Sequence, residues 1–165
     1  MGLKNYFIKK GKHRSGLYPN LYYGKSVAKY NISFSQSCIY SFGNTHDLDI
    51  NKLFGLSFGY HHINSVRFGW NADNDKIAIH AYCYKSGQRF MSKMISIPVE
   101  TFFTFEINAF EVYYELKIID QDGKIISTLN VSKPKTVKWG YRLFPYFGGT
   151  MVAPHDVEIK MRKLC

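Results

Sequence analysis

The chain is 165 residues long, the size of one domain, and its 22 Lys and Arg residues against 12 Asp and Glu residues give a formal net charge of +10. Aromatic residues make up 17% of the chain, which favours strands and turns over helices. The charge favours acidic partners such as nucleic acid or anionic polysaccharide, although solubility alone also explains it. No segment approaches the roughly 18 apolar residues of a membrane span, so we expect no membrane partner.

Three cysteines, Cys38, Cys83 and Cys165, are widely spaced and form no CxxC pair. This number and spacing match neither a disulfide framework nor a zinc site, and they suit a reducing compartment. The first residues are interrupted by lysines and lack the apolar core of a signal peptide. Unless a signal sequence has been removed, we therefore expect a cytoplasmic protein by default.

Alternation of apolar and polar residues with a period of two predicts strands along most of the chain. In chain order it covers residues 29–35, 66–70, 77–83, 103–107, 112–118, 125–126, 137–144 and 157–162. Asp120-Gln121-Asp122-Gly123 is the strongest hairpin signal, and turn-forming residues also occupy 71–75 and 86–87. The alternation places Val137, Trp139, Tyr141 and Leu143 on the apolar side of their strand.

About eight to ten strands without a long helix predict an all-β fold, an antiparallel two-sheet β-sandwich of the jelly-roll kind. No linker or repeat divides the sequence, so residues 1–165 are predicted to form a single domain. Within it, residues 1–24 are the least strand-like and include the basic run from Lys9 to Arg14. We expect an irregular basic arm or loop there.

The densest group of polar side chains lies between Gly59 and Trp70, and it includes His61, Asn64 and Arg67. On an extended strand His61 shares a face with Arg67, so a neutral imidazole and a guanidinium can act together on one ligand. The alternative is that these groups satisfy one another and the backbone at the start of a strand.

A second group runs from Tyr141 to Gly149 and continues to His155. Exposed aromatic rings such as Tyr146 beside glycines suit a stacking platform for sugar rings or bases. The alternative is that the glycines only permit a tight turn and that the aromatic rings cover the core.

The well-marked enzyme and metal motifs are absent from the sequence. It has no P-loop, no HExxH, no GxSxG and no Glu-x-Glu pair, and Cys83 falls on the apolar side of its strand. Asp-x-Asp pairs at 47–49, 73–75 and 120–122 offer oxygen ligands for calcium, but turn capping explains them more simply. We expect no metal site and no cofactor, with calcium as the alternative.

The strand order and the closing segments 146–149 and 155–159 resemble the concanavalin A-like jelly rolls, which include legume-type lectins and family 16 glucanases. The resemblance implies the fold and glycan binding. The catalytic Glu-x-Asp-x-x-Glu of the glucanases is missing, so no catalytic residue carries over. Segments 52–55, 61–65 and 145–149 are also similar to proteins of gut-type Bacteroidetes and their phages, which implies no particular function.

The leading functional expectation is a carbohydrate-binding module that holds a saccharide on a concave face. The expected ligand-binding residues are Trp70, Arg67, Asn64, Tyr146 and His155, with His61 beside them. The alternative is a polysaccharide lyase or glycoside hydrolase acting on an anionic glycan, with His61, Arg67 and His155 as candidate catalytic residues. In that case Arg67 neutralises a substrate carboxylate while His61 or Tyr60 moves a proton.

Two further alternatives need no saccharide. The basic side chains of Lys9, Lys10, Lys12 and Arg14, interleaved with Tyr18, Tyr22 and Tyr23, are able to contact the phosphates of a nucleic acid. A structural protein that associates with itself or with other chains is the remaining alternative.

Overall fold

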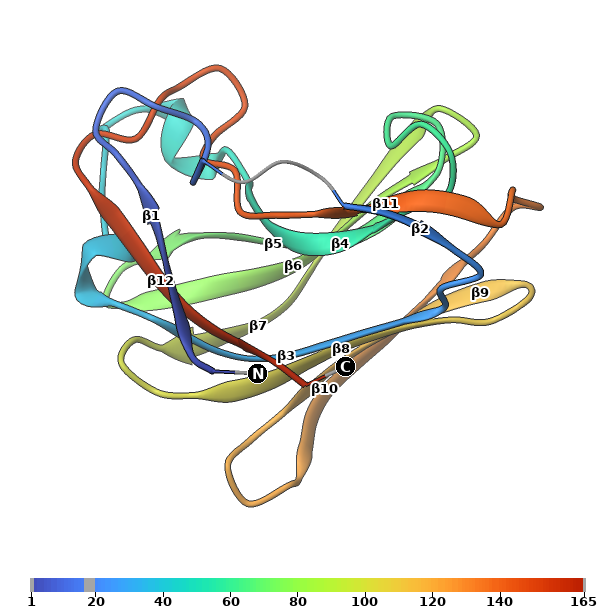
Figure 1. Ribbon diagram of the computed structural model, residues 1–165. Helices are drawn as coiled ribbons and strands as arrows, with labels where there is room; N and C mark the ends of the chain where they lie inside the picture. Colours follow the sequence, from blue (N-terminus) through green and yellow to red (C-terminus); the bar gives the residue numbers. More distant parts are fainter. Residues whose placement is uncertain (1, 17–19, 165) are drawn as a thin grey trace.

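Two antiparallel sheets face each other in this computed structural model, which describes residues 2–16 and 20–164 (Figure 1). Sheet I has the order β1-β12-β3-β8-β9-β10, with bounds Lys4–Ile8, Val157–Lys163, Val27–Phe34, Phe103–Ala109, Tyr113–Ile119 and Ile125–Ser132. Sheet II has the order β2-β11-β4-β5-β6-β7, with bounds Leu21–Tyr23, Trp139–Leu143, Asn51–Ser57, Ser65–Asp73, Lys76–Lys85 and Gln88–Pro98. The predicted antiparallel two-sheet sandwich is therefore confirmed.

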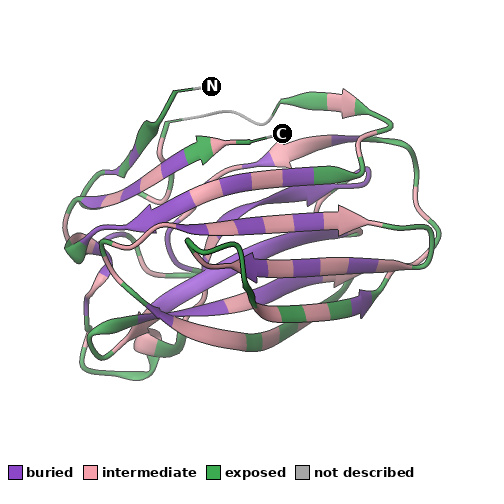
Figure 2. Cartoon of the chain, turned by 90° about the horizontal axis from the view of Figure 1, so that it is seen from below, coloured by how far each residue is buried: buried purple, intermediate pink, exposed green. Residues whose placement is uncertain are grey.

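Alternation along the strands places one side of each sheet in the shared core. In β12, for example, Val157, Ile159 and Met161 are buried while the residues between them are partly exposed. Figure 2 shows this alternation as bands along the strands. Trp70 lies at the centre of an aromatic group, with ring centroids 5.5 Å from Phe34 and 6.1 Å from Phe147.

The central strands of sheet II are buried on both sides. Residues 65–71 of β5 are all buried, including Ser65 and Arg67, whose side chains alternate with the core residues Val66 and Phe68. The outer side of β4 and β5 is covered by loops, which Figure 1 shows rising above these strands. The molecule thus has a second, smaller interior on the side of sheet II that faces away from sheet I.

The predicted hairpins form as the turn residues require. The Asp120 carboxylate accepts hydrogen bonds from the backbone N–H groups of Asp122 and Lys124, and Gly123 has a φ of +81°. Asn74 and the Ser86-Gly87 pair also have positive φ values, in the turns that begin and end β6. Asn and Gly tolerate this conformation better than most residues, so the turn types match the sequence.

Residues 1–24 are not an irregular arm throughout, which corrects the expectation. β1 pairs with β12, and β2 pairs with β11. β1 was missed because only Tyr6 and Ile8 of its five residues are buried, which is too short an alternation to stand out. The prediction also missed β4, which is buried on both faces, and the long, half-exposed edge strand β7.

The expected apolar side of residues 137–144 is also corrected. Val137 and Trp139 are 48% and 49% exposed, while Gly140, the residue after Trp139, is buried and Leu143 is buried farther along. β11 pairs with the short edge strand β2 at this end, beyond the part of the sheet that faces the core. Val137 and Trp139, at the start of β11 beside this short strand, therefore remain at the surface.

The two tryptophans allow a matched test of this core. Trp70→Ala removes a fully buried ring and is expected to lower the free energy of unfolding by about 3–5 kcal/mol, because a cavity remains. Trp139→Ala removes a half-exposed ring and is expected to change it by about 0.5 kcal/mol. Chemical denaturation followed by circular dichroism measures both; equal effects of the two substitutions would contradict this assignment of the core.

Candidate functional site

A cleft of about 450 Å³ opens on the outer side of sheet II, and we call it the Arg67 cleft. Side chains from β4, β5 and β6, from the β4–β5 loop and from two crossing loop segments surround it. The lining residues are Arg14, Lys52, Tyr60, His61, His62, Ser65, Arg67, Tyr82, Tyr84, Tyr146, Gly148 and Gly149.

The floor of the cleft is set by the register of β5 and β6. Ser65 pairs with Tyr84, and Arg67 pairs with Tyr82. Because every second residue of a strand points to the same side, these four side chains all face away from the core. Lys52 of β4 lies beside them, with its Nζ 5.2 Å from the centre of the Tyr82 ring. On the floor, the cationic side chains of Arg67 and Lys52 therefore lie beside the phenol rings of the tyrosines.

One wall is the segment that carries Tyr146. It is held like a strand, because the backbone groups of Tyr146 and Lys52 exchange two hydrogen bonds of 2.8 and 2.9 Å. On its other side Tyr146 bridges to Arg14, and its ring stacks on His13 with a centroid distance of 5.1 Å. Gly148 follows at a φ of +70°, where a Cβ atom would lie 2.0 Å from the Met151 carbonyl oxygen. The backbone conformation of this wall therefore requires a glycine at position 148.

Arg67 is a buried cation without a counter-ion among the described residues. The residue is 8% exposed. Its Nη2 donates a 3.0 Å hydrogen bond to the carbonyl of Phe144, and its buried Nε has no hydrogen-bond partner. No described carboxylate lies within ion-pairing distance of it. Burial lowers the pKa of the guanidinium to about 10, which leaves it charged at neutral pH. An unpaired buried charge of this kind is costly and is expected to attract an anion.

Lys52 is the second cation of the cleft. Burial, followed by the repulsion of Arg67, lowers the pKa of its ammonium group to about 8, although Asp49 partly opposes this. Its Nζ donates a 2.8 Å hydrogen bond to the Gly148 carbonyl, so the charge is directed toward the wall of the cleft. Lys52 and Arg67 thus place two partly desolvated positive charges in one small volume.

His61 is held on the opposite wall by Tyr141. Its Nδ1 lies 2.6 Å from the Tyr141 hydroxyl, and its backbone carbonyl accepts a hydrogen bond from Ser65. Burial and the nearby His62, Arg67 and Arg14 lower the pKa of His61 to about 4. The imidazole is therefore neutral at physiological pH and able to accept a proton or a hydrogen bond.

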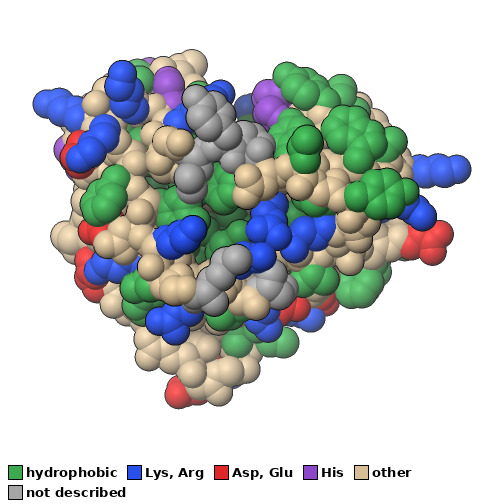
Figure 3. Space-filling view, viewed as in Figure 1, with side chains coloured by type: hydrophobic (Ala, Val, Ile, Leu, Met, Phe, Trp, Pro, Cys, Tyr) green, Lys and Arg blue, Asp and Glu red, His purple; other side chains and the backbone are tan. Residues whose placement is uncertain are grey.

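The electrostatic character of the cleft is positive throughout. Arg14, Lys52 and Arg67 line it, and no Asp or Glu belongs to the lining residues. Figure 3 shows Lys and Arg side chains over much of one face of the molecule, with acidic side chains mainly toward its margins. The cleft concentrates this general excess of charge at a place that is partly shielded from water, where electrostatic attraction is stronger.

The structure brings together three of the predicted site residues and separates the other three. His61, Arg67 and Tyr146 line the Arg67 cleft. Trp70 is fully buried in the core, so its assignment to a ligand-binding surface is corrected; it follows the alternation of Phe68 rather than that of Arg67.

Asn64 and His155 make structural contacts elsewhere. The Asn64 side chain accepts a hydrogen bond from the backbone of Ser86, beside a neighbouring hollow. The His155 Nε2 lies 2.7 Å from the carbonyl of Ser37, against the short 3-10 helix η1 (Gln36–Cys38). Neither residue lines the Arg67 cleft.

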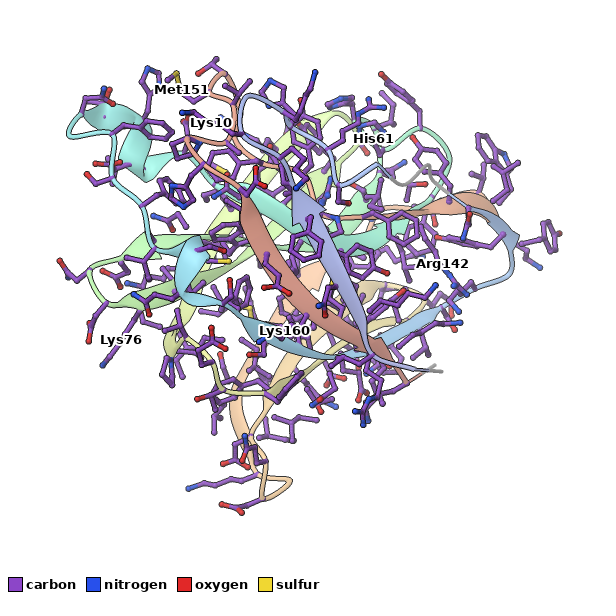
Figure 4. All side chains as sticks on the ribbon, turned by 60° about the vertical axis from the view of Figure 1, so that its left-hand side comes forward. Lys10, His61, Lys76, Arg142, Met151 and Lys160 are labelled. Atoms are coloured by element: carbon purple, nitrogen blue, oxygen red, sulfur yellow. The ribbon has the colours of Figure 1, made fainter. Side chains whose placement is uncertain are left out.

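The basic residues near the N-terminus divide into two groups. Lys9 forms an ion pair with Asp156 at 2.8 Å, and the backbone N–H of Lys10 donates to the same carboxylate. The Gly11 N–H donates to the Ala153 carbonyl, and the Ala153 N–H donates to the Lys12 carbonyl. Figure 4 shows Lys10 close to Met151 on this neighbouring loop. Arg14 alone lines the cleft. Tyr18, named with them as a nucleic-acid contact, and Cys165 lie outside the described residues, and nucleic-acid binding stays a prediction.

The remaining polar and thiol groups have structural surroundings. Within residues 2–16 and 20–164 no three His, Cys, Asp or Glu side chains gather as metal ligands. The Asp47 carboxylate instead accepts backbone hydrogen bonds from Phe42 and Gly43. Cys83 is fully buried, as predicted, and burial raises the pKa of its thiol to about 12. No helix in the described part of the chain has the length and apolar character to cross a membrane.

Three lining residues escaped the sequence analysis as members of a site. Tyr82 and Tyr84 alternate with the core residues Ala81 and Cys83, so a strand that is aromatic on its second face was a signal for a covered outer surface. Lys52, a single charge at the start of an apolar run, was a second signal. His62, which belongs to the polar group between Gly59 and Trp70, also lines the cleft, with its ring 5.2 Å from that of Tyr84.

Comparisons with known proteins identify the fold. No protein-family model matches the sequence, and no curated protein matches it. Among solved structures, the alginate lyase from Klebsiella pneumoniae is similar with a TM-score of 0.67 and 9% identity, over 84% of this chain and 58% of its own. A functionally unknown protein from Saccharomyces cerevisiae is similar with a TM-score of 0.59 and 8% sequence identity, over 96% of this chain and 82% of its own.

SCLam, a non-specific endo-β-1,3(4)-glucanase from family GH16, gives a TM-score of 0.52 and 8% identity, over 88% of this chain and 57% of its own. The chain therefore spans less than two thirds of both the lyase and the glucanase. At these identities the likeness shows the fold alone, and it confirms the predicted jelly-roll sandwich.

The unpaired charge of Arg67 has a measurable consequence for stability. Arg67→Met is expected to leave the free energy of unfolding unchanged or to raise it by about 1 kcal/mol, because an apolar chain replaces an uncompensated buried cation. Ser65→Ala is the contrast: it removes a satisfied 2.8 Å hydrogen bond to the His61 carbonyl and is expected to cost about 1 kcal/mol. Urea denaturation measures both. A loss of more than about 2 kcal/mol in Arg67→Met would mean that the charge is compensated within the chain.

Proposed function

We propose that this protein binds an acidic saccharide in the Arg67 cleft. The observation that carries the proposal is the buried guanidinium of Arg67, which has a free N–H and no counter-ion among the described residues. A carboxylate or sulfate group accepts two parallel hydrogen bonds from a guanidinium, so an acidic sugar supplies what Arg67 lacks. Lys52 and Arg14 add positive charge around the same place.

The other lining groups suit a sugar rather than a small inorganic anion. Tyr60, Tyr82, Tyr84 and Tyr146 present phenol rings, which combine an apolar face for the C–H groups of a sugar ring with a hydroxyl that pairs with sugar hydroxyls. The cleft volume of about 450 Å³ is within the usual range for small-ligand sites. The alginate lyase and the glucanase, by their names, act on polysaccharides, which adds support at the level of the fold.

A second candidate function is cleavage of the same ligand by β-elimination. The neutral imidazole of His61 on the wall of the cleft favours it, because its Nδ1 is fixed on the Tyr141 hydroxyl. In this reaction a base removes the proton on the carbon next to a uronate carboxylate, the C–O bond to the leaving sugar breaks, a C=C double bond forms and the leaving oxygen takes up a proton. Arg67 would stabilise the negative charge that develops on the carboxylate.

The binding proposal predicts a local effect of charge. Lys52→Gln is expected to lower the affinity for an oligouronate at least tenfold, because it removes a charge-assisted contact in a partly buried place. Isothermal titration calorimetry at low ionic strength measures this, with the melting temperature recorded for each variant.

Lys76→Gln is the matched control for that experiment. It makes the same change of net charge at an exposed position, the first residue of β6, which Figure 4 shows far from His61. The control is expected to bind like the wild type. Equal losses in the two variants would show that the ligand responds only to net charge and not to the cleft.

The lyase candidate is tested with the same oligouronates. β-Elimination produces an unsaturated sugar whose ultraviolet absorbance increases with time. His61→Ala is expected to abolish this increase and to weaken binding by less than tenfold, because His61 transfers the proton rather than holding the charge. If the wild type binds the oligomers and no absorbance develops, binding alone is the function.

A further inference from the structure

The Arg67 cleft is closed at one end. The next pair along β5 and β6 after Arg67 and Tyr82 is Gly69 and His80, and neither lines the cleft. A Cβ atom on Gly69 would lie 2.4 Å from the Cγ2 of Ile50, so the Ile50 side chain lies directly on the backbone of Gly69. A ligand chain therefore cannot continue along the sheet past this point.

The loop that carries Ile50 is fastened to the sheet beyond it. The Asn71 side chain donates to the Asp47 carbonyl at 3.1 Å, and its oxygen lies 2.7 Å from the Nε2 of His80. Asp47 belongs to the short 3-10 helix η2 (Thr45–Leu48), just before Ile50. Burial lowers the pKa of His80 to about 4, so the imidazole is neutral at neutral pH, and its Nε2–H donates to the amide oxygen, which can only accept. The closed end is thus part of the folded structure.

The other end of the cleft leads over Tyr60 to a second hollow. Tyr60 is 58% exposed in the β4–β5 loop, and it lines both the Arg67 cleft and a neighbouring hollow of about 420 Å³. We call the far side of that hollow the Trp139 platform, formed by Ile63, Val137 and Trp139 with Lys135 beside them. Figure 3 shows hydrophobic side chains gathered at the upper right, where Figure 1 draws the β4–β5 loop and the end of β11.

The Trp139 platform is held firmly by the backbone. The N–H of Gly59 donates to the Trp139 carbonyl at 2.9 Å, and Trp139 pairs with Tyr23 of β2. Gly59 has a φ of +76°, and a Cβ atom there would lie 3.2 Å from Val137, so the loop packs closely beside the platform. An aromatic ring that is half exposed and fixed at its backbone is suited to stack on a flat ligand group at a low entropy cost.

The charge around this hollow has the same sign as in the cleft. Its lining residues include Lys135 and no Asp or Glu. Lys133, Lys135 and Lys138 line a further hollow next to it, together with the acidic Glu111. An acidic chain that leaves the cleft over Tyr60 therefore continues along a surface that is mainly positive.

We propose that the Arg67 cleft takes the end of an acidic polysaccharide chain, and that the following sugar units run over Tyr60 and stack on the Trp139 platform. This inference rests on the proposed function and adds to it the kind of ligand: a chain terminus of several units rather than the interior of a polymer. Ile50 blocks continuation of the chain along β5 and β6, and the shared residue Tyr60 connects the cleft to the hollow in front of the Trp139 platform. A smaller hollow that shares Arg14, His61, Arg67 and Tyr146 with the cleft leads toward Leu143 and Pro145, but it has no exposed tryptophan on which a sugar could stack.

The first test counts protein molecules per ligand chain. Calorimetric titration of uronate chains of increasing, defined length is expected to give one bound protein for each equivalent end, with no increase as the chains grow. If the number of bound proteins rises in proportion to chain length while binding still depends on Lys52, the end-binding arrangement is overturned and the proposed function stands. If no chain of any length binds, both fail.

The second test separates the Trp139 platform from the cleft. Trp139→Ala is expected to leave the affinity for a disaccharide unchanged and to lower that for a hexasaccharide about tenfold, because only the longer chain reaches the Trp139 ring and loses its stacking contact. Phe7→Ala is the control, because Phe7 is 45% exposed on β1 of sheet I. Equal affinities of the wild type and Trp139→Ala for the hexasaccharide would overturn the proposed role of the platform. A dimer in analytical ultracentrifugation that Trp139→Ala abolishes would also overturn it, because the exposed ring would then serve self-association.

Discussion

The central strands of sheet II, β4 and β5, are buried on both faces, and the rest of the structure depends on this constraint. Their inner side packs against sheet I around Trp70, and their outer side is covered by loops, one of which pairs with Lys52 of β4 through Tyr146. A strand in this position has no face left for water, so each of its polar side chains must find a partner inside the protein or in a ligand. The Ser65 hydroxyl donates to the His61 carbonyl. The Arg67 guanidinium donates only to the Phe144 carbonyl, and its Nε–H has no partner.

This imbalance ties stability to function. A guanidinium buried without a counter-ion lowers the stability of the free protein, and a bound anion would return that energy as affinity. The surrounding elements hold the charge in place: Tyr146 pairs with Lys52 on one side, and Tyr141 fixes His61 on the other. The cleft is therefore organised before any ligand arrives, which reduces the entropy lost on binding.

The fold was largely predictable because the strands of sheet I alternate regularly and their turns carry diagnostic residues, as at Asp120 to Gly123. The site was predictable only in part. His61, Arg67 and Tyr146 were identified as polar or aromatic groups in unusual surroundings, and they do line one cleft.

The rest of the site was misassigned or missed. Trp70 was assigned to the ligand surface because it follows Arg67 closely in sequence, although strand alternation puts the two on opposite faces. Lys52 comes to the cleft through pairings with distant strands, and Tyr82 through its register with Arg67. Contacts between residues so far apart in the sequence produce no regular spacing from which they could be predicted.

The lowered pKa of Lys52 also gives the cleft a chemical property that a fixed charge lacks. A group that loses its proton near pH 8 is partly neutral in mildly alkaline solution. An anion bound beside it favours the charged form, so the pKa rises and binding draws a proton from the buffer. If the cleft binds an anion as proposed, its affinity would fall as the pH passes about 8, well before ordinary lysines lose their charge near pH 10.4. Binding of the anion and binding of a proton would then be linked, so that a change in either concentration alters the affinity for the other.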